Sequence, residues 1–291
     1  MSALSTSEAP TTREASREAG LAALRARIRA LEVGAGGAGG RRVLPLGVAA
    51  LDRHLPGGGL PLACLHEIEG ARAEWDDGAA TGFCLALLAR LSAAAPGRAP
   101  ILWVGCWRDL YAPGLAAFGL DPGRLILVRA GGEADVLWAM EEGLRCADLA
   151  AVVGEVETLE RCAGRRLQLA AEAGGVTAFL LRRRLRPARR APAPSSALTR
   201  WRAAPARSAT LACPAGEPLS GAAVEKLPGR PRWAVELLRC RGAAPGQWLV
   251  EWDDATGGFA LAAALRDGSV APESTPAGAR GGGMPGARMA G

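Results

Sequence analysis

The sequence predicts an α/β fold in which helices cover both faces of a mostly parallel sheet. From residue 41 to about residue 211, apolar runs of strand length alternate with longer segments of helical periodicity. Strands that alternate with helices in this way are joined by crossover helices and lie parallel to one another. After residue 232 the apolar period changes to two, which predicts antiparallel strands appended to that sheet.

The elements of the parallel part follow one another closely as far as residue 181. Short runs rich in Val, Ile and Leu predict strands, and apolar residues spaced three and four apart predict helices. The predicted helices span residues 44–55, 83–94, 110–118, 133–146 and 157–173, and the predicted strands span residues 60–69, 101–106, 125–128, 149–153 and 177–181.

Two C-terminal stretches alternate apolar and polar side chains, which is typical of antiparallel strands with one buried face. A turn at residues 253–258 then leads into a further apolar segment at residues 259–265. The alternating apolar residues are Trp233, Val235 and Leu237 in the first stretch and Trp248, Val250 and Trp252 in the second.

The two ends of the chain differ from the part between them. Residues 12–32 have the periodicity of an amphipathic helix, and the glycine-rich residues 34–40 predict a flexible tether. We therefore divide the chain into a helix with its tether (1–40), a core (41–267) and a tail expected to be disordered (268–291). The apolar stripe of the helix packs either on its own core or on a neighbour or partner, and it consists of Leu21, Leu24, Ile28 and Leu31.

Composition excludes several classes of protein. The chain has 291 residues, 49% of them apolar, without a membrane-length apolar run or a signal-type N-terminus, so we expect a cytoplasmic protein with a full core. Its 7 cysteines form no C-x-x-C pair and indicate reduced, buried thiols. With only His54 and His66, a zinc site or a Ser/His triad has little to be built from, and we expect no metal site. The formal net charge of +6 permits a nucleic-acid partner.

The segment from Gly70 to the helix at residues 83–94 has the layout of a phosphate-binding loop without its chemistry. Such a loop needs a Lys for the β- and γ-phosphates and a Ser or Thr hydroxyl for Mg²⁺, but Ala79 and Ala80 follow Gly78, and Lys226 is the only lysine of the chain. Acidic residues also lie in the loop, and like charges about 4 Å apart repel by roughly 4 kcal/mol at an effective dielectric near 20. We therefore expect no ATP binding and no cofactor. The acidic residues are Glu74, Asp76 and Asp77.

Several segments resemble RecA-type ATPases. Residues 46–52, 56–61 and 66–70 are similar to the entry to the RecA core, and residues 109–122 are similar to the segment after its second core strand. The more specific resemblance is to the ImuA family, the RecA-like accessory proteins of bacterial inducible mutagenesis. It rests on residues 199–202, 233–241 and 248–257, and it spans about residues 41–265.

The resemblance implies a RecA-like core with degenerate nucleotide motifs. The strand that would end in a Walker B carboxylate ends in Gly154, although Glu155 follows and could hold Mg²⁺. Gly105-Cys106-Trp107 stands where a catalytic glutamate is expected. Three tryptophans lie near these strand ends: Trp75, Trp103 and Trp107. Their rings could fill the core, fill the space that a nucleotide would occupy, or form part of a partner surface.

The resemblance also implies a function and partners. We expect a scaffold, not an enzyme, in damage-induced translesion DNA synthesis, in complex with an ImuB-like inactive Y-family polymerase homologue and an error-prone C-family polymerase. A homo-oligomer and contact with RecA remain open. The alternatives are a damage-inducible cell-division inhibitor of the SulA type and a RecA-type ATPase dependent on single-stranded DNA.

A basic segment is a candidate DNA-binding site. No acidic residue occurs between Glu172 and Glu217, and RecA-like loops at this level of the chain contact single-stranded DNA. An inert solvated loop, or contact with an acidic patch on a partner, explains the same charge. The candidate residues are Arg182, Arg183, Arg184, Arg186, Arg189, Arg190, Arg200, Trp201 and Arg202, with Arg207 beyond them.

The C-terminal block is a candidate partner-binding surface, because its strands alternate and one face must point away from the core. Arg239 and Arg241 are the candidate contacts on that face, together with the neighbouring Glu236 and Glu251.

Overall fold

The structure is a computed structural model, and it describes residues 41–73, 75–94, 97, 99–107, 109–183, 195–208 and 229–263. The predicted N-terminal helix with Leu21, Leu24, Ile28 and Leu31, the tether and the C-terminal tail lie outside the described residues. Within the described part, no helix is long and apolar enough to cross a membrane.

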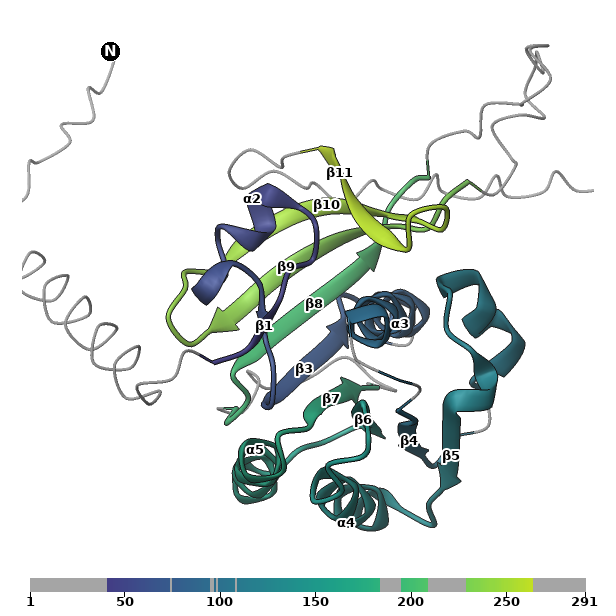
Figure 1. The fold of residues 1–291 in the computed structure, drawn as a ribbon, viewed down its shortest axis with the longest axis vertical. Coiled ribbons are helices and arrows are strands. Elements are labelled where there is room, and N and C mark those ends of the chain that lie inside the picture. Colours follow the sequence, from purple (N-terminus) through teal and green to yellow (C-terminus); the bar gives the residue numbers. More distant parts are fainter. Residues whose placement is uncertain are drawn as a thin grey trace, which may run out of the picture.

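A nine-stranded sheet forms the centre of the described part (Figure 1). Six neighbouring strands, from β8 to β5, pair in parallel, and the last three strands of the chain extend the sheet with antiparallel pairs. The predicted α/β class is therefore confirmed. In spatial order the strands are β11 (Gly258–Ala263), β10 (Gly246–Asp253), β9 (Arg232–Cys240), β8 (Thr199–Pro205), β3 (Leu65–Gly70), β7 (Thr177–Arg182), β6 (Ala151–Val156), β4 (Ile101–Gly105) and β5 (Leu125–Arg129).

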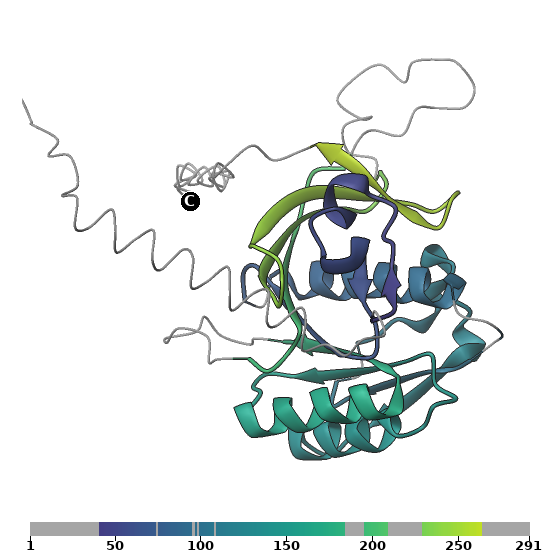
Figure 2. The ribbon, with the colours of Figure 1, turned by 60° about the vertical axis from the view of Figure 1, so that its left-hand side comes forward.

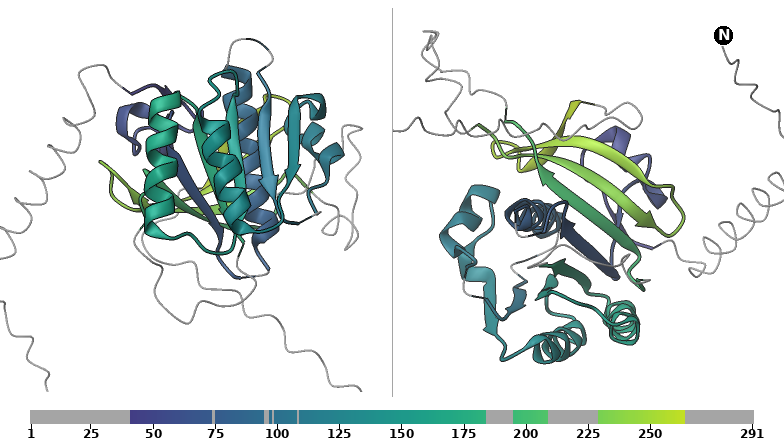
Figure 3. Two further views of the ribbon diagram at one scale, coloured as in Figure 1. Left: turned by 90° about the horizontal axis from the view of Figure 1, so that it is seen from below. Right: turned by 180° about the vertical axis from the view of Figure 1, so that it is seen from behind.

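Helices cover the parallel strands on both faces. Helices α4 (Glu133–Leu144) and α5 (Arg161–Gly174) lie side by side on one face, and α3 (Asp77–Ala94) lies on the other (Figures 1 and 3). Helix α3 is buried on most of its sides because β8 and the antiparallel strands curve over it (Figure 2). A helix in that position must be apolar all round, as its sequence is.

The tryptophans of the C-terminal block form the core above α3. Trp201, Trp233, Trp248 and Trp252 are 0 to 6% exposed, and they pack with Phe83 and its aromatic neighbours at ring-centroid distances of 5.4–6.4 Å. Offset and edge-on aromatic pairs at this separation stabilise a core beyond their buried area. The C-terminal strands therefore complete the domain.

Several predicted boundaries were wrong for local reasons. The helix predicted at 110–118 is a 3₁₀ segment, η2 (Ala112–Phe118), because Pro113 and Gly114 disfavour a regular α-helix. The helix predicted at 44–55 is reduced to α2 (Ala49–Asp52) and η1 (Pro56–Gly58), next to a small hairpin of β1 (Val43–Leu44) and β2 (Leu60–Pro61). A last 3₁₀ turn, η3 (Pro122–Arg124), precedes β5.

Strand β6 is longer than predicted, and strand β8 was not predicted. Strand β6 continues through Gly154 and Glu155, and a side chain at Gly154 would lie 2.1 Å from the Met140 sulfur of α4, so packing requires this glycine. Strand β8 was not predicted, because arginines occupy its alternate positions and suggested an exposed basic segment.

Candidate ligand-binding pocket

The loop between β3 and α3 folds back on the end of β3. The backbone N–H of Arg72 donates to the Asp76 carboxylate at 2.9 Å, and Asp76 is only 1% exposed. A side chain at Gly70 would lie 2.8 Å from the Asp76 carbonyl carbon. Gly70 is therefore required where the loop passes over the end of β3. The Asp76 carboxylate stabilises the loop by accepting a hydrogen bond from the loop backbone.

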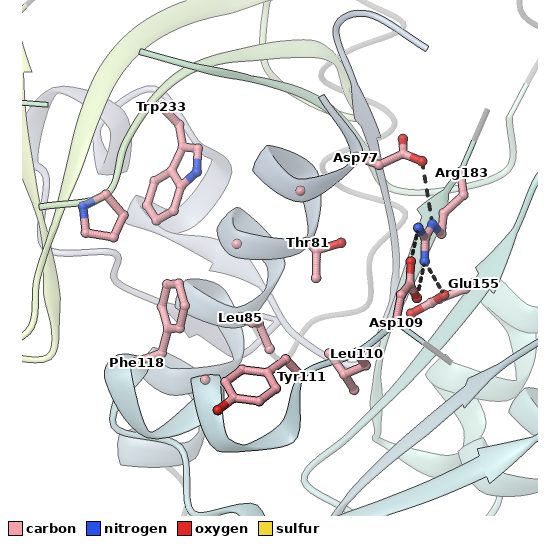
Figure 4. A pocket seen from close by; sticks show the side chains of 14 residues that line it. Asp77, Thr81, Leu85, Asp109, Leu110, Tyr111, Phe118, Glu155, Arg183 and Trp233 are labelled. Atoms are coloured by element: carbon pink, nitrogen blue, oxygen red, sulfur yellow. Dashed lines mark hydrogen bonds and ion pairs between the residues drawn. The ribbon is translucent and has the colours of Figure 1, made fainter. Parts of the chain in front are cut away.

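The degenerate positions of the loop lie in the first turns of α3. Ala79 and Ala80 are 9% and 3% exposed and belong to the apolar core. Gly78 and Thr81 instead line a cavity beside the helix (Figure 4). Thr81 lies one position after the expected Ser or Thr, and no role was predicted for it.

Arg183 follows β7 and connects three segments of the chain at the carboxyl ends of the parallel strands (Figure 4). Its guanidinium donates to the Asp109 carboxylate at 2.8 Å and to Glu155 at 3.1 Å, and it lies 3.5 Å from Asp77. Its Cζ also lies 5.0 Å from the ring centroid of Trp107, a cation–π contact. The cation thus joins the start of α3, the segment after β4, and β6.

Burial and charge shift the pKa values of this cluster in opposite directions. The hydrogen bond from Arg183 lowers the pKa of Asp109, and the same contact raises the pKa of Arg183. Burial raises the pKa of Glu155, which Arg183 and Trp103 partly offset. Arg183 therefore favours the charged form of Glu155 and opposes the effect of its burial.

Glu155 is fully engaged by protein groups. One of its carboxylate oxygens accepts from the Trp103 indole N–H at 2.6 Å, and the other accepts from Arg183 at 3.1 Å. A Mg²⁺ ion at Glu155 would have to displace a guanidinium. Among the described residues, no group of three or more His, Cys, Asp or Glu side chains is arranged to hold a metal ion.

The cavity has a volume of about 430 Å³ and two unlike sides. Among the described residues, the polar side carries three carboxylates and one guanidinium, from Asp77, Asp109, Glu155 and Arg183. The other side is apolar and aromatic, and it includes Leu85, Leu110, Tyr111, Phe118 and Trp233 (Figure 4). Carboxylates in this position would repel the phosphates of a nucleotide placed beside them.

The structure describes only part of the predicted DNA-binding set, and the placement of Trp201 contradicts its proposed role. Trp201 is 0% exposed and packs on Phe83, so its ring cannot stack on a base. Arg184, Arg186, Arg189 and Arg190 lie outside the described residues, and Arg207 is exposed.

The remaining arginines of that set are paired within the protein. Arg200 and Arg202 donate to Glu69 at 2.8 and 3.2 Å, and Arg202 also donates to Glu236 at 3.2 Å. Arg182 lies 3.7 Å from Glu67. These guanidiniums neutralise the buried carboxylates of β3, and a phosphate would have to compete with those carboxylates.

The other predicted residues divide between core and surface. Trp103 is a core residue, Trp107 packs against Arg183, and Trp75 is 79% exposed. Arg239 is exposed and donates to the Ser195 carbonyl, whereas Arg241 is half-buried.

The histidines and cysteines have structural roles. Burial lowers the pKa of His66 to about 4, and His66 contacts the Thr199 hydroxyl at 2.6 Å. His54 packs edge-on against Trp248. The six described cysteines are free thiols, but Cys146 and Cys162 are exposed, so the expectation of buried thiols holds only in part.

Comparison with known proteins identifies close relatives. The chain is 40% identical over 237 residues to protein ImuA of Caulobacter vibrioides strain NA1000 / CB15N, and the alignment covers 79% of this chain and 92% of that protein. Protein ImuA of Caulobacter vibrioides strain ATCC 19089 / CIP 103742 / CB 15 gives the same values. No family model matches the chain. The crystal structure of SulA from Pseudomonas aeruginosa aligns at 26% identity with 42% of this chain and 98% of that chain, but its TM-score of 0.35 supports no argument.

Proposed function

Because this chain belongs to the ImuA family, we propose that it acts in DNA-damage-induced mutagenesis as a non-catalytic accessory protein. The observation that carries the non-catalytic part is the Arg183 cluster. Asp77 begins α3, where a phosphate-binding loop would present backbone N–H groups and a lysine, and Asp109 and Glu155 lie next to it around Arg183. A triphosphate placed there would meet negative charge, and like charges about 4 Å apart repel by roughly 4 kcal/mol.

We propose that the parallel part of the sheet is a RecA-like core with degenerate Walker motifs. The order of strand β3, a tight loop and a buried helix α3 supports this, as does a carboxylate, Glu155, in a neighbouring strand. The methyl groups of Ala79 and Ala80 face the core in place of a lysine and a hydroxyl. Packing would then have replaced phosphate binding as the role of this helix turn.

In the proposed assembly, the chain is an adaptor that joins an ImuB-like polymerase homologue to an error-prone C-family polymerase during SOS-induced translesion synthesis. An adaptor needs a stable core and free surfaces but no turnover. The exposed Arg239 of β9 and the N-terminal stripe of Leu21, Leu24, Ile28 and Leu31 are the proposed contact sites. We also propose that the protein contacts single-stranded DNA through Arg184, Arg186, Arg189 and Arg190.

A genetic complementation experiment in the natural host tests this function. Deletion of the gene should reduce the ultraviolet-induced mutation frequency about as much as deletion of the ImuB-like gene does. Expression of the Glu155→Gln variant should restore that frequency, because a non-catalytic protein does not need the carboxylate. An unchanged frequency in the deletion strain would refute the role in mutagenesis. A folded Glu155→Gln variant that fails to restore it would refute the non-catalytic role.

A further inference from the structure

We infer that the N-terminal segment of this chain docks on the outer face of its own helices α4 and α5. The sequence predicts an amphipathic helix over residues 12–32, with one apolar stripe between residues 21 and 31. Trp138 of α4 and Leu169 of α5 would contact that stripe. The inference does not depend on the proposed function. If the stripe contacts a partner, as proposed above, that partner has to displace the helix from this face.

The outer face of α4 and α5 exposes two large apolar side chains. Trp138 is 64% exposed and Leu169 is 46% exposed. Each follows a buried residue, Val136 or Leu167, by two positions, which is about 200° of helical turn, so both side chains point away from the sheet. The two helices lie side by side, and no described segment of the chain lies over their outer face (Figure 3).

An ion pair between the two helices shows that these side chains share one surface. Arg166 Nε of α5 lies 3.2 Å from Glu141 Oε2 of α4. Glu141 follows Trp138 by three positions, and Leu169 follows Arg166 by three, so each apolar side chain lies one helical turn from the ion pair on the same side of its helix. An amphipathic helix that crosses both helices can therefore contact both side chains with residues three, four or seven positions apart, as its stripe provides.

The connection to the core is long enough for docking within one chain. Arg41, the first described residue, donates to Glu172 in the last turn of α5 at 3.0 Å. The ends of α4 and α5 meet, because a side chain at Gly174 would lie 1.9 Å from the Leu144 carbonyl oxygen. Trp138 lies about 9 Å along the axis from that end of α4, and neighbouring helix axes lie about 8–10 Å apart. The residues between the predicted helix and Arg41 can span up to about 29 Å, at roughly 3.6 Å per residue.

The charges of the segment and of α4 are complementary. Arginines border the apolar stripe on both sides, Arg27 on one side and Arg25 and Arg29 on the other. The exposed carboxylates of Asp135 and Glu142 lie one turn before and one turn after the exposed indole of α4. Either orientation of the docked helix therefore brings a guanidinium near a carboxylate. Exposed pairs of this kind add little affinity, but they favour one orientation of the helix.

Hydrogen exchange of the full-length protein, measured by mass spectrometry over a wide range of protein concentration, tests the inference. The readout is the exchange rate of the backbone amides of residues 21–32. Trp138→Asp removes the proposed contact, and its control, Trp75→Asp, makes the same change at a tryptophan that is 79% exposed in the loop before α3. Both variants should keep the circular dichroism of the wild type. A reciprocal variant, Leu24→Asp with Ile28→Asp, changes the stripe, and hydroxyl-radical footprinting then measures the oxidation of Trp138.

The amides of residues 21–32 should exchange slowly in the wild type at every concentration, because an isolated helix of this length is only marginally stable in water. Trp138→Asp should accelerate their exchange about tenfold, and Trp75→Asp should leave it unchanged. The reciprocal variant should raise the oxidation of Trp138 but not that of Trp75. Fast exchange in the wild type, or equal rates in the Trp138→Asp and Trp75→Asp variants, would overturn the site. Slow exchange that is lost on dilution would identify a second copy as the occupant and overturn docking within one chain.

Discussion

Arg183 ties the end of β7 to α3, to the segment after β4 and to β6. Its importance was visible in the sequence only as part of a basic run. The sequence could not show that its charge is used internally, because Asp77, Asp109 and Glu155 come from three distant segments. A single residue thus holds three segments together beside the first turn of α3.

Arg183→Met should lower the free energy of unfolding. Removing one partner of a buried ion pair costs about 3–5 kcal/mol, and the partial exposure of Arg183 reduces the expected loss to about 2–3 kcal/mol. The control, Arg145→Met, removes exposed ion pairs with Glu141 and Glu142 and should cost about 0–1 kcal/mol. Urea unfolding of both variants measures the difference, and equal losses would show that the cluster is not a stabilising contact.

The loss caused by Arg183→Met should also depend on pH. Burial already raises the folded-state pKa of Glu155 above its ordinary value, and removal of the guanidinium should raise it further. The folded variant then binds a proton that the unfolded chain has released, so its stability falls as the pH rises from the unfolded pKa through the folded pKa. The variant should therefore be less destabilised at pH 5 than at pH 8. A loss that is constant between these pH values would show that Glu155 does not titrate in this range in the folded variant, contrary to the expected rise of its pKa.

Gly70→Ala and Gly78→Ala should have opposite effects on the melting temperature. A methyl group at Gly70 meets the backbone of Asp76 at 2.8 Å, and forced overpacking of this kind costs about 1–3 kcal/mol. A methyl group at Gly78 has open space in the first turn of α3, where alanine is favoured over glycine by up to about 1 kcal/mol. Thermal unfolding of both variants measures the difference. If the two glycines served phosphate binding and not packing, the two variants would have similar melting temperatures in the absence of a ligand.

At the scale of elements, helices and strands with a strong apolar period could be predicted from the sequence. Elements that depend on contacts between distant segments could not. Helix α4, strand β7 and the C-terminal strands follow directly from apolar periods in the sequence. Strand β8 was missed because its arginines are buried against the carboxylates of β3, an arrangement that only the folded sheet creates. Of the candidate site, the loop positions and Glu155 were predictable, whereas the cavity depends on Thr81, Tyr111 and Trp233, which tertiary packing brings together.

Truncation after Pro231 should abolish cooperative folding. The deleted strands β9–β11 contribute Trp233, Trp248 and Trp252 to the core above α3. Loss of a buried tryptophan costs about 3–5 kcal/mol, and a whole domain has about 5–15 kcal/mol of stability. Circular dichroism during urea unfolding should show no cooperative transition for this variant, whereas removal of residues 269–291 should leave the transition unchanged. A cooperative transition in the variant truncated after Pro231 would show that the strands are an independent appendage.

At the scale of the whole molecule, the cavity lies where the parallel part of the sheet ends. The carboxyl ends of parallel strands meet there, as they do in α/β sheets that bind ligands. In this chain the described lining of that cavity consists of the Arg183 cluster on one side and an apolar, aromatic wall on the other. This lining differs from a phosphate-binding site and agrees with the non-catalytic role that we propose.

Calorimetric titration of the full-length protein with ATP and Mg²⁺ tests this account most directly. Because Ala79 and Ala80 offer no phosphate ligand and three carboxylates surround Arg183, we expect no saturable heat at millimolar nucleotide. The intrinsic tryptophan fluorescence should likewise show no saturable change, although Trp107 and Trp233 lie beside the site. A micromolar Kd accompanied by ATP turnover would contradict the account.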